Sequence, residues 1–315
     1  MSVRPAFLPE SRTLVQLSDF HLFSPPPLRF EDCFSKRLYG RLAWQRRRHE
    51  LDPEILAAMV EDINRQQPDL VAVTGDLTHL GHRAEYLQAR KVLDDLGGPE
   101  RVMVIPGNHD AYVPGAWENN FSLLGDYLAG DGKGLSDDFP TYPVLRTLGE
   151  VAVIGLNTAQ PRPLWLATGR LGEKQLVLLA ERLEDCGRRL QARVILIHHP
   201  PIPGVAGWRR RLSDAKDFYR VVAARGAELI LYGHIHRELR TFLWADQRPV
   251  PCFSVPAAAA RGRSLSRRSR YHIYRLSRNP DGSWRLDYTI RRWSVAGSVF
   301  RDEISGSYSC SAVGR

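Results

Sequence analysis

Short apolar runs rich in β-branched residues recur along the chain and predict buried strands. They cover residues 14–17, 70–74, 102–105, 151–156, 194–197 and 229–232, and each is bounded by Gly, Asn, Asp or His. Segments with helical periodicity lie between several of these runs, at 53–66, 84–96, 173–186 and 214–225. Pro53 suits a first helical turn and Gly187 a helix end. The alternation of strands and helices predicts an α/β fold.

The last part of the chain has the pattern of a β-hairpin instead. Apolar runs at 271–276 and 284–290 flank the turn-forming sequence Asn-Pro-Asp-Gly at 279–282. We expect this hairpin to complete a second sheet, within a β-rich C-terminal part at about 250–295. No internal repeat or sharp change in composition separates a second domain, so we predict a single domain over residues 1–315.

The composition is that of a soluble globular protein, with 43% hydrophobic and 25% charged residues. No apolar run approaches the roughly 18–20 residues that cross a bilayer, and the start, MSVRPAFLPESR, lacks a secretory apolar stretch, so we expect a cytoplasmic address. The four cysteines are scattered, which disfavours a thiolate zinc site and a disulfide framework. The net charge of +9 favours an anionic partner, such as nucleic acid, an anionic membrane or a phosphorylated substrate.

Carboxylate, amide and imidazole side chains follow the predicted strands, where α/β sheets place their ligands. These residues are Asp19, His21, Asp76, Asn108, His109, Asp110, His198, His199, His234 and His236. Two divalent cations about 3.5–4 Å apart, held by a shared carboxylate and by neutral nitrogen and oxygen donors, can activate a bridging hydroxide that attacks phosphorus. Asp76 is the natural shared carboxylate. The donor types favour Mn, Fe or Zn, and among these we favour Mn.

Spacing supports convergence of these ligands on one cluster. Asp19 and His21 are two residues apart, as are His234 and His236, so on an extended backbone each pair points to one side. Glycines precede three of the motifs and allow tight turns and close backbone approach to an anion. They are Gly75, Gly107 and Gly233.

The ordered motifs Asp-x-His, Gly-Asp, Gly-Asn-His-Asp, His and Gly-His-x-His, from Asp19 to His236, resemble the signature of the calcineurin-like metallophosphoesterases. The resemblance implies a four-layer αββα sandwich of two mixed β-sheets flanked by helices. It also implies a first metal on Asp19, His21, Asp76 and His236, and a second on Asp76, Asn108, His198 and His234. The His-x-Pro form matches His198, so His199 is not carried over.

The same resemblance places His109 outside the ligand set, where it would polarise the phosphoryl group or protonate the leaving oxygen. Asp110 could orient the His109 imidazole. For the remaining polar residues we expect structural roles: His79 and His82 as solvent-facing loop residues, His199 as a structural histidine, and Asn157 bonded to its own loop backbone.

Residues 28–49 form a basic amphipathic insert with seven Lys or Arg residues. Phe30, Phe34, Leu38 and Leu42 recur every four residues, and a basic cluster follows. This pattern suits a segment on an anionic lipid surface, at the inner face of the membrane. The contacts would come from Phe34, Leu38, Leu42, Arg46, Arg47 and Arg48. The alternative is a helix packed on the domain with a solvated basic face.

We therefore predict a dinuclear-metal hydrolase of a phosphodiester or pyrophosphate bond. The insert resembles, loosely, those of enzymes that cleave UDP-2,3-diacylglucosamine in lipid A synthesis, which implies a membrane-associated UDP-linked lipid as substrate. A cyclic-nucleotide phosphodiesterase is the alternative, because it shares the same motifs. A nuclease would fit the net charge. This sequence, however, lacks the capping segments of the family's DNA-repair members, so nucleic acid is not an expected partner. A non-catalytic scaffold conflicts with the complete ligand set.

Overall fold

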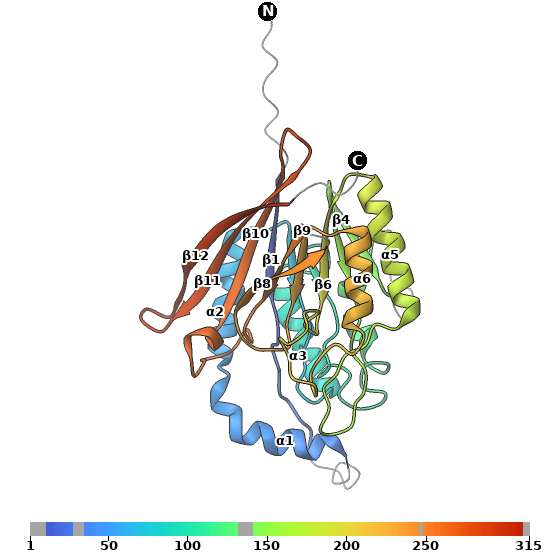
Figure 1. Cartoon of the computed structure of the whole chain (residues 1–315). Coiled ribbons are helices and arrows are strands. Elements are labelled where there is room, and N and C mark those ends of the chain that lie inside the picture. The colour runs from blue at the N-terminus through green and yellow to red at the C-terminus, as the bar shows by residue number, and fades with distance from the viewer. Residues whose placement is uncertain (1–10, 28–34, 132–140, 246–247, 311–315) are drawn as a thin grey trace, which may run out of the picture.

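The computed structural model describes residues 11–27, 35–131, 141–245 and 248–310, and it contains two mixed sheets (Figure 1). The first sheet has the order β12-β11-β10-β1-β2-β3 and the second β4-β5-β6-β7-β9-β8. In the first sheet the strands are β1 Arg12–Leu17, β2 Leu70–Val73, β3 Val102–Val104, β10 Arg270–Arg278, β11 Trp284–Ser294 and β12 Val299–Cys310. In the second they are β4 Val144–Leu148, β5 Val151–Gly155, β6 Ala192–Ile197, β7 Leu229–Tyr232, β8 Leu239–Ala245 and β9 Arg248–Ser254.

The helices lie between and beside these strands. They are α1 Lys36–Arg47, α2 Pro53–Gln66, α3 Arg83–Asp95, α4 Gly125–Leu128, α5 Glu173–Arg188 and α6 Ala215–Arg225, with short 3-10 turns η2 Arg48–Glu50, η3 Phe121–Leu124 and η4 Leu265–Arg267. Helix α2 begins where Pro53 predicts, because the Asp52 side chain accepts a hydrogen bond from the Glu54 N–H. The predicted stop at Gly187 is wrong, since α5 continues to Arg188.

Alternating side chains on the strands create three apolar layers and thus the four-layer sandwich that the sequence predicted. Leu14 points into the core between the two sheets, whereas the next residue, Val15, points to the core under α2 and α3. A third core joins the outer face of the second sheet to α5 and α6, which Figure 1 shows on that side. None of the helices in the described ranges is both long and apolar enough to span a bilayer.

The predicted hairpin forms but joins the first sheet, so its assignment to a second sheet is wrong. Strand β10 pairs antiparallel with β1, with Tyr274 opposite Leu14, and β11 follows it. Tyr274 and Leu286 are thereby buried in the core between the sheets. The β-rich part also extends beyond 295, because β12 pairs with β11 as far as Cys310. In both sheets the central strands run parallel, so their carboxyl ends share one edge.

Candidate dinuclear metal centre

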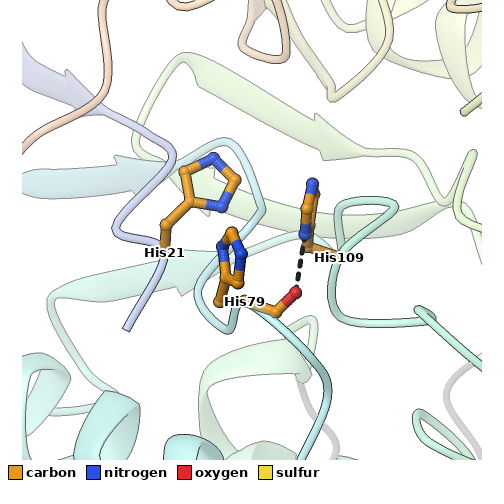
Figure 2. Close-up of side chains that lie close together, drawn as sticks. All are labelled: His21, His79 and His109. Carbon is orange, nitrogen blue, oxygen red and sulfur yellow. Dashed lines mark hydrogen bonds between the residues drawn. The ribbon is translucent and has the colours of Figure 1, made fainter. Parts of the chain in front are cut away.

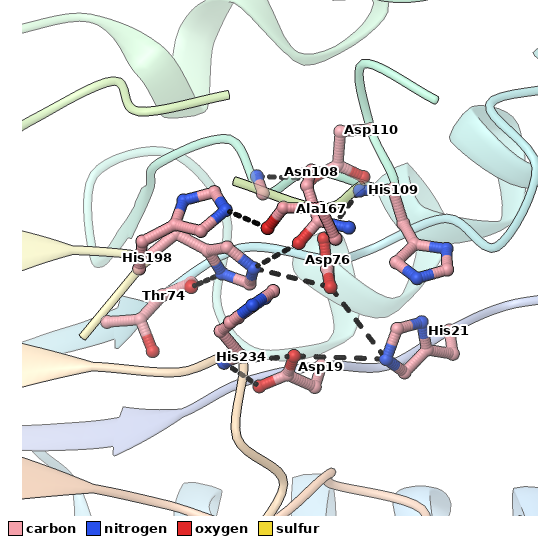
Figure 3. A network of polar contacts seen from close by, with 12 residues as sticks. Asp19, His21, Thr74, Asp76, Asn108, His109, Asp110, Ala167, His198 and His234 are labelled. Atoms are coloured by element: carbon pink, nitrogen blue, oxygen red, sulfur yellow. Dashed lines mark hydrogen bonds and ion pairs between the residues drawn. The ribbon is translucent and has the colours of Figure 1, made fainter. Parts of the chain in front are cut away.

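The predicted metal ligands follow the carboxyl ends of β1, β2, β3, β6 and β7, and the structure brings them together at this edge (Figure 3). The loops after β1 and β2 run side by side, because Asp19 N–H donates to Gly75 O at 2.9 Å and His21 N–H donates to Asp76 O at 3.0 Å. The loop after β7 joins them: His234 N–H lies 3.2 Å from Asp19 Oδ2.

Left-handed backbone, rather than an extended segment, aims the ligands. The φ angles are 57° at Asp19, 49° at His21, 53° at Asp76, 70° at His234 and 50° at His236. The argument from extended pairs is therefore wrong, although the pairs do converge. Residues other than glycine rarely adopt this conformation, and it concentrates at functional sites. In the described part of the chain only three other non-glycine residues share it, so the strain is concentrated at this edge.

One group of potential ligands contains Asp19, His21, Asp76 and His236, with one donor atom from each within 4.8 Å of the others. The Nε2 atoms of His21 and His236 are 2.9 Å apart, and His236 Nε2 is 3.2 Å from Asp19 Oδ1. Two imidazole nitrogens that face one another at this distance can bind the same metal ion. The group supplies two imidazoles and two carboxylates, which is a donor set for a borderline or hard divalent cation.

A second group contains Asp76, His198 and His234, again with donor atoms within 4.8 Å. His198 Nε2 lies 3.2 Å from Asn108 Oδ1, which brings the amide beside this group. His198 Nδ1 donates to the carbonyl of Thr74 at 2.7 Å, and this bond turns Nε2 toward the centre. His234 Nε2 is buried and has no hydrogen-bond partner among the described residues, as expected of a nitrogen whose partner is a cation.

Asp76 belongs to both groups and lies between them (Figure 3). Its Oδ2 is 3.9 Å from His21 Nε2 and 3.3 Å from His198 Nε2. Its Oδ1 instead accepts a hydrogen bond from the His109 backbone N–H at 2.7 Å. The carboxylate is thus held by one oxygen while the other faces both groups. These residues fit a pair of cations that share one carboxylate.

The comparison with known proteins now decides the family. The calcineurin-like phosphoesterase model matches residues 12–238, well over half of the chain. The chain belongs to this family. A Synechococcus sp. protein named "Probable cyclic nucleotide phosphodiesterase" is 28% identical over 87% of this chain and 90% of its own. The 3',5'-cyclic adenosine monophosphate phosphodiesterase CpdA of Pseudomonas aeruginosa is 28% identical over 71% of this chain and 70% of its own.

Solved structures share the fold at low sequence identity. A dimetal phosphatase from Danio rerio has a TM-score of 0.57 at 13% identity, with 96% of this chain and 99% of its own covered. Purple acid phosphatase PPD1 from yellow lupin has a TM-score of 0.61 at 14% identity, with 96% of this chain and 54% of its own covered. The protein is a metal-dependent phosphoesterase, and the family together with the two ligand groups indicates a dinuclear metal site.

Burial and neighbouring charges together set the protonation of this phosphoesterase site. Burial lowers the pKa of His21 and His234 well below the usual value, and neighbouring imidazoles lower it further, so both side chains are neutral near pH 7. Burial raises the pKa of Asp76, but the charges of His198 and His109 outweigh that effect and hold it well below its usual range. Neutral imidazole and ionised carboxylate are the forms that bind metal ions.

His79 is the site residue that the sequence analysis missed, because it was expected to face solvent. It lies with His21 and His109 in a third group of donor atoms (Figure 2). The rings of His79 and His109 stack with centroids 5.2 Å apart, and burial lowers the pKa of His79 to about 3. The sequence offered one indication that His79 belongs to the site, namely its position in the loop that follows Asp76. His82 is half-buried at the start of α3, where its N–H donates to Glu85.

Among the described residues, no hydrogen bond joins the Asp110 carboxylate to the His109 ring. Its carboxylate accepts hydrogen bonds from Thr78 N–H at 3.0 Å and Gly107 N–H at 2.8 Å, so it joins the loops after β2 and β3. Burial raises its pKa to about 7, and Asp76 acts in the same direction. The His109 ring is held by the carbonyl of His79, 2.7 Å from Nδ1 (Figure 2). The hydrogen bonds of the Asp110 carboxylate thus hold the loops after β2 and β3 together, and a catalytic role of Asp110 stays a prediction.

His199 and Asn157 have the structural roles predicted. His199 is buried, with Nδ1 2.7 Å from Thr158 Oγ1 and Nε2 3.2 Å from the carbonyl of Ala167. Asn157 Oδ1 accepts from Ala159 N–H at 2.8 Å, within its own loop.

Glycines that precede the ligands let the backbone come close to other groups, as predicted. The groups approached are side chains of the site rather than a bound anion. A Cβ at Gly107 would lie 2.2 Å from Asp76 Oδ1, and a Cβ at Gly233 would lie 2.2 Å from Ser18 Oγ and 2.8 Å from Asp19 Oδ2. All three distances to oxygen are shorter than any normal carbon contact. The glycines therefore let the loops after β3 and β7 close on the two carboxylates.

The insert forms α1, which packs one face on the domain. Arg37 donates to the carbonyls of Leu80 and Gly81, and Trp44 stacks on Phe23 with centroids 3.7 Å apart. Leu38 is half-buried, whereas Leu42, Arg46 and Arg48 are exposed, so the predicted apolar stripe is not a single exposed face. Phe30, Phe34 and the side chain of Arg47 lie outside the described part of the structure.

Proposed function

We propose that this metallophosphoesterase hydrolyses a phosphodiester or pyrophosphate bond at a centre of two cations. Asp19, His21, Asp76 and His236 would hold one cation, and Asp76, Asn108, His198 and His234 the other. The position of Asp76 Oδ2, within 3.9 Å of His21 Nε2 and 3.3 Å of His198 Nε2, is the observation that carries the proposal. Nitrogen and oxygen donors without thiolate suit Mn, Fe or Zn, with Mn favoured.

Bound cations would activate water as the nucleophile and neutralise charge on the phosphoryl oxygens. The protein's own contribution beyond the ligands centres on His109. Its Nδ1 donates to the His79 carbonyl, which leaves Nε2 as the nitrogen that titrates. Burial lowers the pKa of His109, and an adjacent phosphate anion would raise it again. Protonated, Nε2 would hydrogen-bond the phosphoryl group or donate to the leaving oxygen.

Cyclic nucleotides are one candidate substrate class. This candidate is supported by relatives that are named as cyclic-nucleotide phosphodiesterases and that match this chain over most of its length. A screen with Mn²⁺ against bis(p-nitrophenyl) phosphate, cyclic AMP, a UDP-linked lipid and duplex DNA tests the proposal. We expect hydrolysis of bis(p-nitrophenyl) phosphate and of one of the two middle substrates. Hydrolysis of none of the four, by protein with a full metal complement, would contradict the proposed function.

A membrane-associated UDP-linked lipid is the second candidate, and exposed apolar side chains beside the site favour it. In α1, Tyr39 is 57% and Leu42 is 46% exposed. Two further loops carry Trp165, 64% exposed, and Trp208, 63% exposed. Figure 1 shows α1 and the loops that precede α5 and α6 along the same lower edge. Tryptophan and leucine beside arginine are typical of surfaces that rest on anionic lipid.

Both exposed sets are tied to the site. The Ala167 N–H donates to the Arg209 carbonyl at 2.8 Å, which joins the two tryptophan loops, and the Ala167 carbonyl bonds to His199. Exposed arginines accompany the aromatic rings on both sides. They are Arg46 in α1, Arg48 directly after it, and Arg209, Arg210 and Arg211 after Trp208. Each contributes about 1 kcal/mol near an anionic surface. We propose peripheral docking on the inner face of the membrane through this edge.

Vesicle sedimentation tests the docking proposal separately from the chemistry. Leu42→Ser, Trp165→Ser and Trp208→Ser together should reduce binding to phosphatidylserine vesicles at least about tenfold, through lost apolar burial. Trp244→Ser is the matched control, because Trp244 is 59% exposed on β8 at the edge of the second sheet. Equal sedimentation of the triple variant and the native protein would refute docking by this edge.

A further inference from the structure

Helix α1 carries a lysine to the side of the metal centre on which His109 lies. The Lys36 Nζ is 4.2 Å from the centre of the Tyr112 ring, and that ring stacks on His109 with centroids 5.3 Å apart. Lys36 is half-buried, and its charge acts on both His109 and Asp76, because it lowers the pKa of His109 and Asp76 raises that of Lys36.

The position of Lys36 is fixed by close packing of its helix. A Cβ at Gly40 would lie 2.5 Å from Leu80 Cδ2 and 2.5 Å from the Tyr112 hydroxyl, so α1 touches the loops after β2 and β3 with no spare room. Arg37 adds hydrogen bonds of 3.1 Å to the Leu80 carbonyl and 2.9 Å to the Gly81 carbonyl. Lys36 therefore extends from a backbone that the site loops themselves hold in place.

The Lys36 ammonium lacks an anionic partner at close range among the described residues. In the described ranges Lys36 forms no ion pair with a carboxylate, and the Tyr112 ring offers only a partial substitute. Burial lowers the pKa of Lys36 to about 8, so it still carries charge near pH 7. A partly buried cation whose nearest acting counter-charge, Asp76, lies beyond ion-pair distance is costly, and a bound anion reduces that cost.

We propose that Lys36 binds an anionic group on the leaving side of the substrate, so that the enzyme selects pyrophosphate bonds over diesters with a neutral leaving group. This inference rests on the proposed hydrolysis, since His109 marks the leaving side. In a pyrophosphate the leaving group is itself a phosphate, whose oxygens accept hydrogen bonds from an ammonium group. Charge that develops on that leaving phosphate as the bond breaks would be stabilised by the Lys36 ammonium.

The ratio of two substrates tests this specificity. UDP-glucose offers a soluble pyrophosphate bond, and bis(p-nitrophenyl) phosphate offers a leaving group without a phosphate. Lys36→Met should lower the ratio of kcat/KM for UDP-glucose to that for bis(p-nitrophenyl) phosphate about 10- to 100-fold, as for a lost hydrogen bond to a charged group. Lys36→Arg should restore most of the ratio, and Lys91→Met on the exposed side of α3 should leave it unchanged. An unchanged ratio in Lys36→Met would overturn the proposal.

A second readout does not depend on turnover. An amine-reactive ester should label Lys36 readily at pH 8, where part of its amine is neutral, and peptide mass spectrometry locates the label. UDP-glucose should slow labelling of Lys36 at least about threefold and leave Lys91 unaffected, because a bound anion holds the ammonium form. Equal labelling with and without UDP-glucose would refute the anion contact. If the native protein hydrolyses neither substrate, the proposed function fails while labelling still decides the role of Lys36.

Discussion

Gly107→Ala tests whether the loop after β3 must approach Asp76 as closely as the structure shows. The added Cβ would lie 2.2 Å from Asp76 Oδ1 and 2.3 Å from Asp76 N, against an ordinary contact of 3.4 Å or more. Asp76 or the loop must therefore move by about 1 Å, whereas metal–ligand distances tolerate about 0.2 Å. Gly107 does not have a left-handed φ, so the effect is steric rather than a backbone strain.

The expected result is a large loss of turnover together with a moderate loss of stability. A displacement of about 1 Å costs about 10²-fold in rate, and overpacking costs about 1–3 kcal/mol of unfolding free energy. Turnover of bis(p-nitrophenyl) phosphate across a Mn²⁺ titration measures the first, and urea unfolding measures the second. Gly207→Ala is the control, because a Cβ there meets no atom within 4 Å. Native metal affinity and turnover in Gly107→Ala would refute the reasoning.

Two further substitutions address the acid and the buried core. His109→Asn should keep the metal content and lower the rate roughly 10²- to 10⁴-fold, as for a lost general acid, and lower metal content would instead identify His109 as a ligand. His272 is buried away from the site, and burial lowers its pKa to about 3. The unfolded chain therefore binds more protons between about pH 6.5 and 3, and stability falls as pH falls through that window. His272→Leu should reduce this slope by about 1 kcal/mol per pH unit in unfolding measurements between pH 6 and 4, and an unchanged slope would contradict the assignment.

The convergence of these candidate ligands was predictable because each of them follows closely after a strand end in the sequence. Strands such as β2 and β7 are continuous apolar runs, and their pattern places Asp76 and His234 at the shared edge. The backbone conformation at these residues was not predictable, since the left-handed φ of Asp19 and His21 depends on hydrogen bonds to the neighbouring loop.

Features that depend on contacts between distant segments were missed. Lys36 lies beside the site only because α1 packs on the loops after β2 and β3, and no local pattern encodes that packing. Strand β12 was missed because its alternate residues are mostly exposed and polar. The hairpin was recognised but misplaced, since periodicity identifies a strand without naming its neighbour, and β10 pairs with β1.

Metal stoichiometry of the native protein and of Asp76→Ala is the most direct test of a centre that shares one carboxylate. We predict two Mn²⁺ per native chain by elemental analysis after equilibrium dialysis. In Asp76→Ala, binding of both ions should weaken and hydrolysis of bis(p-nitrophenyl) phosphate should be lost, while the circular dichroism spectrum stays native. Two tightly bound Mn²⁺ and near-native turnover at limiting Mn²⁺ in Asp76→Ala would contradict the account.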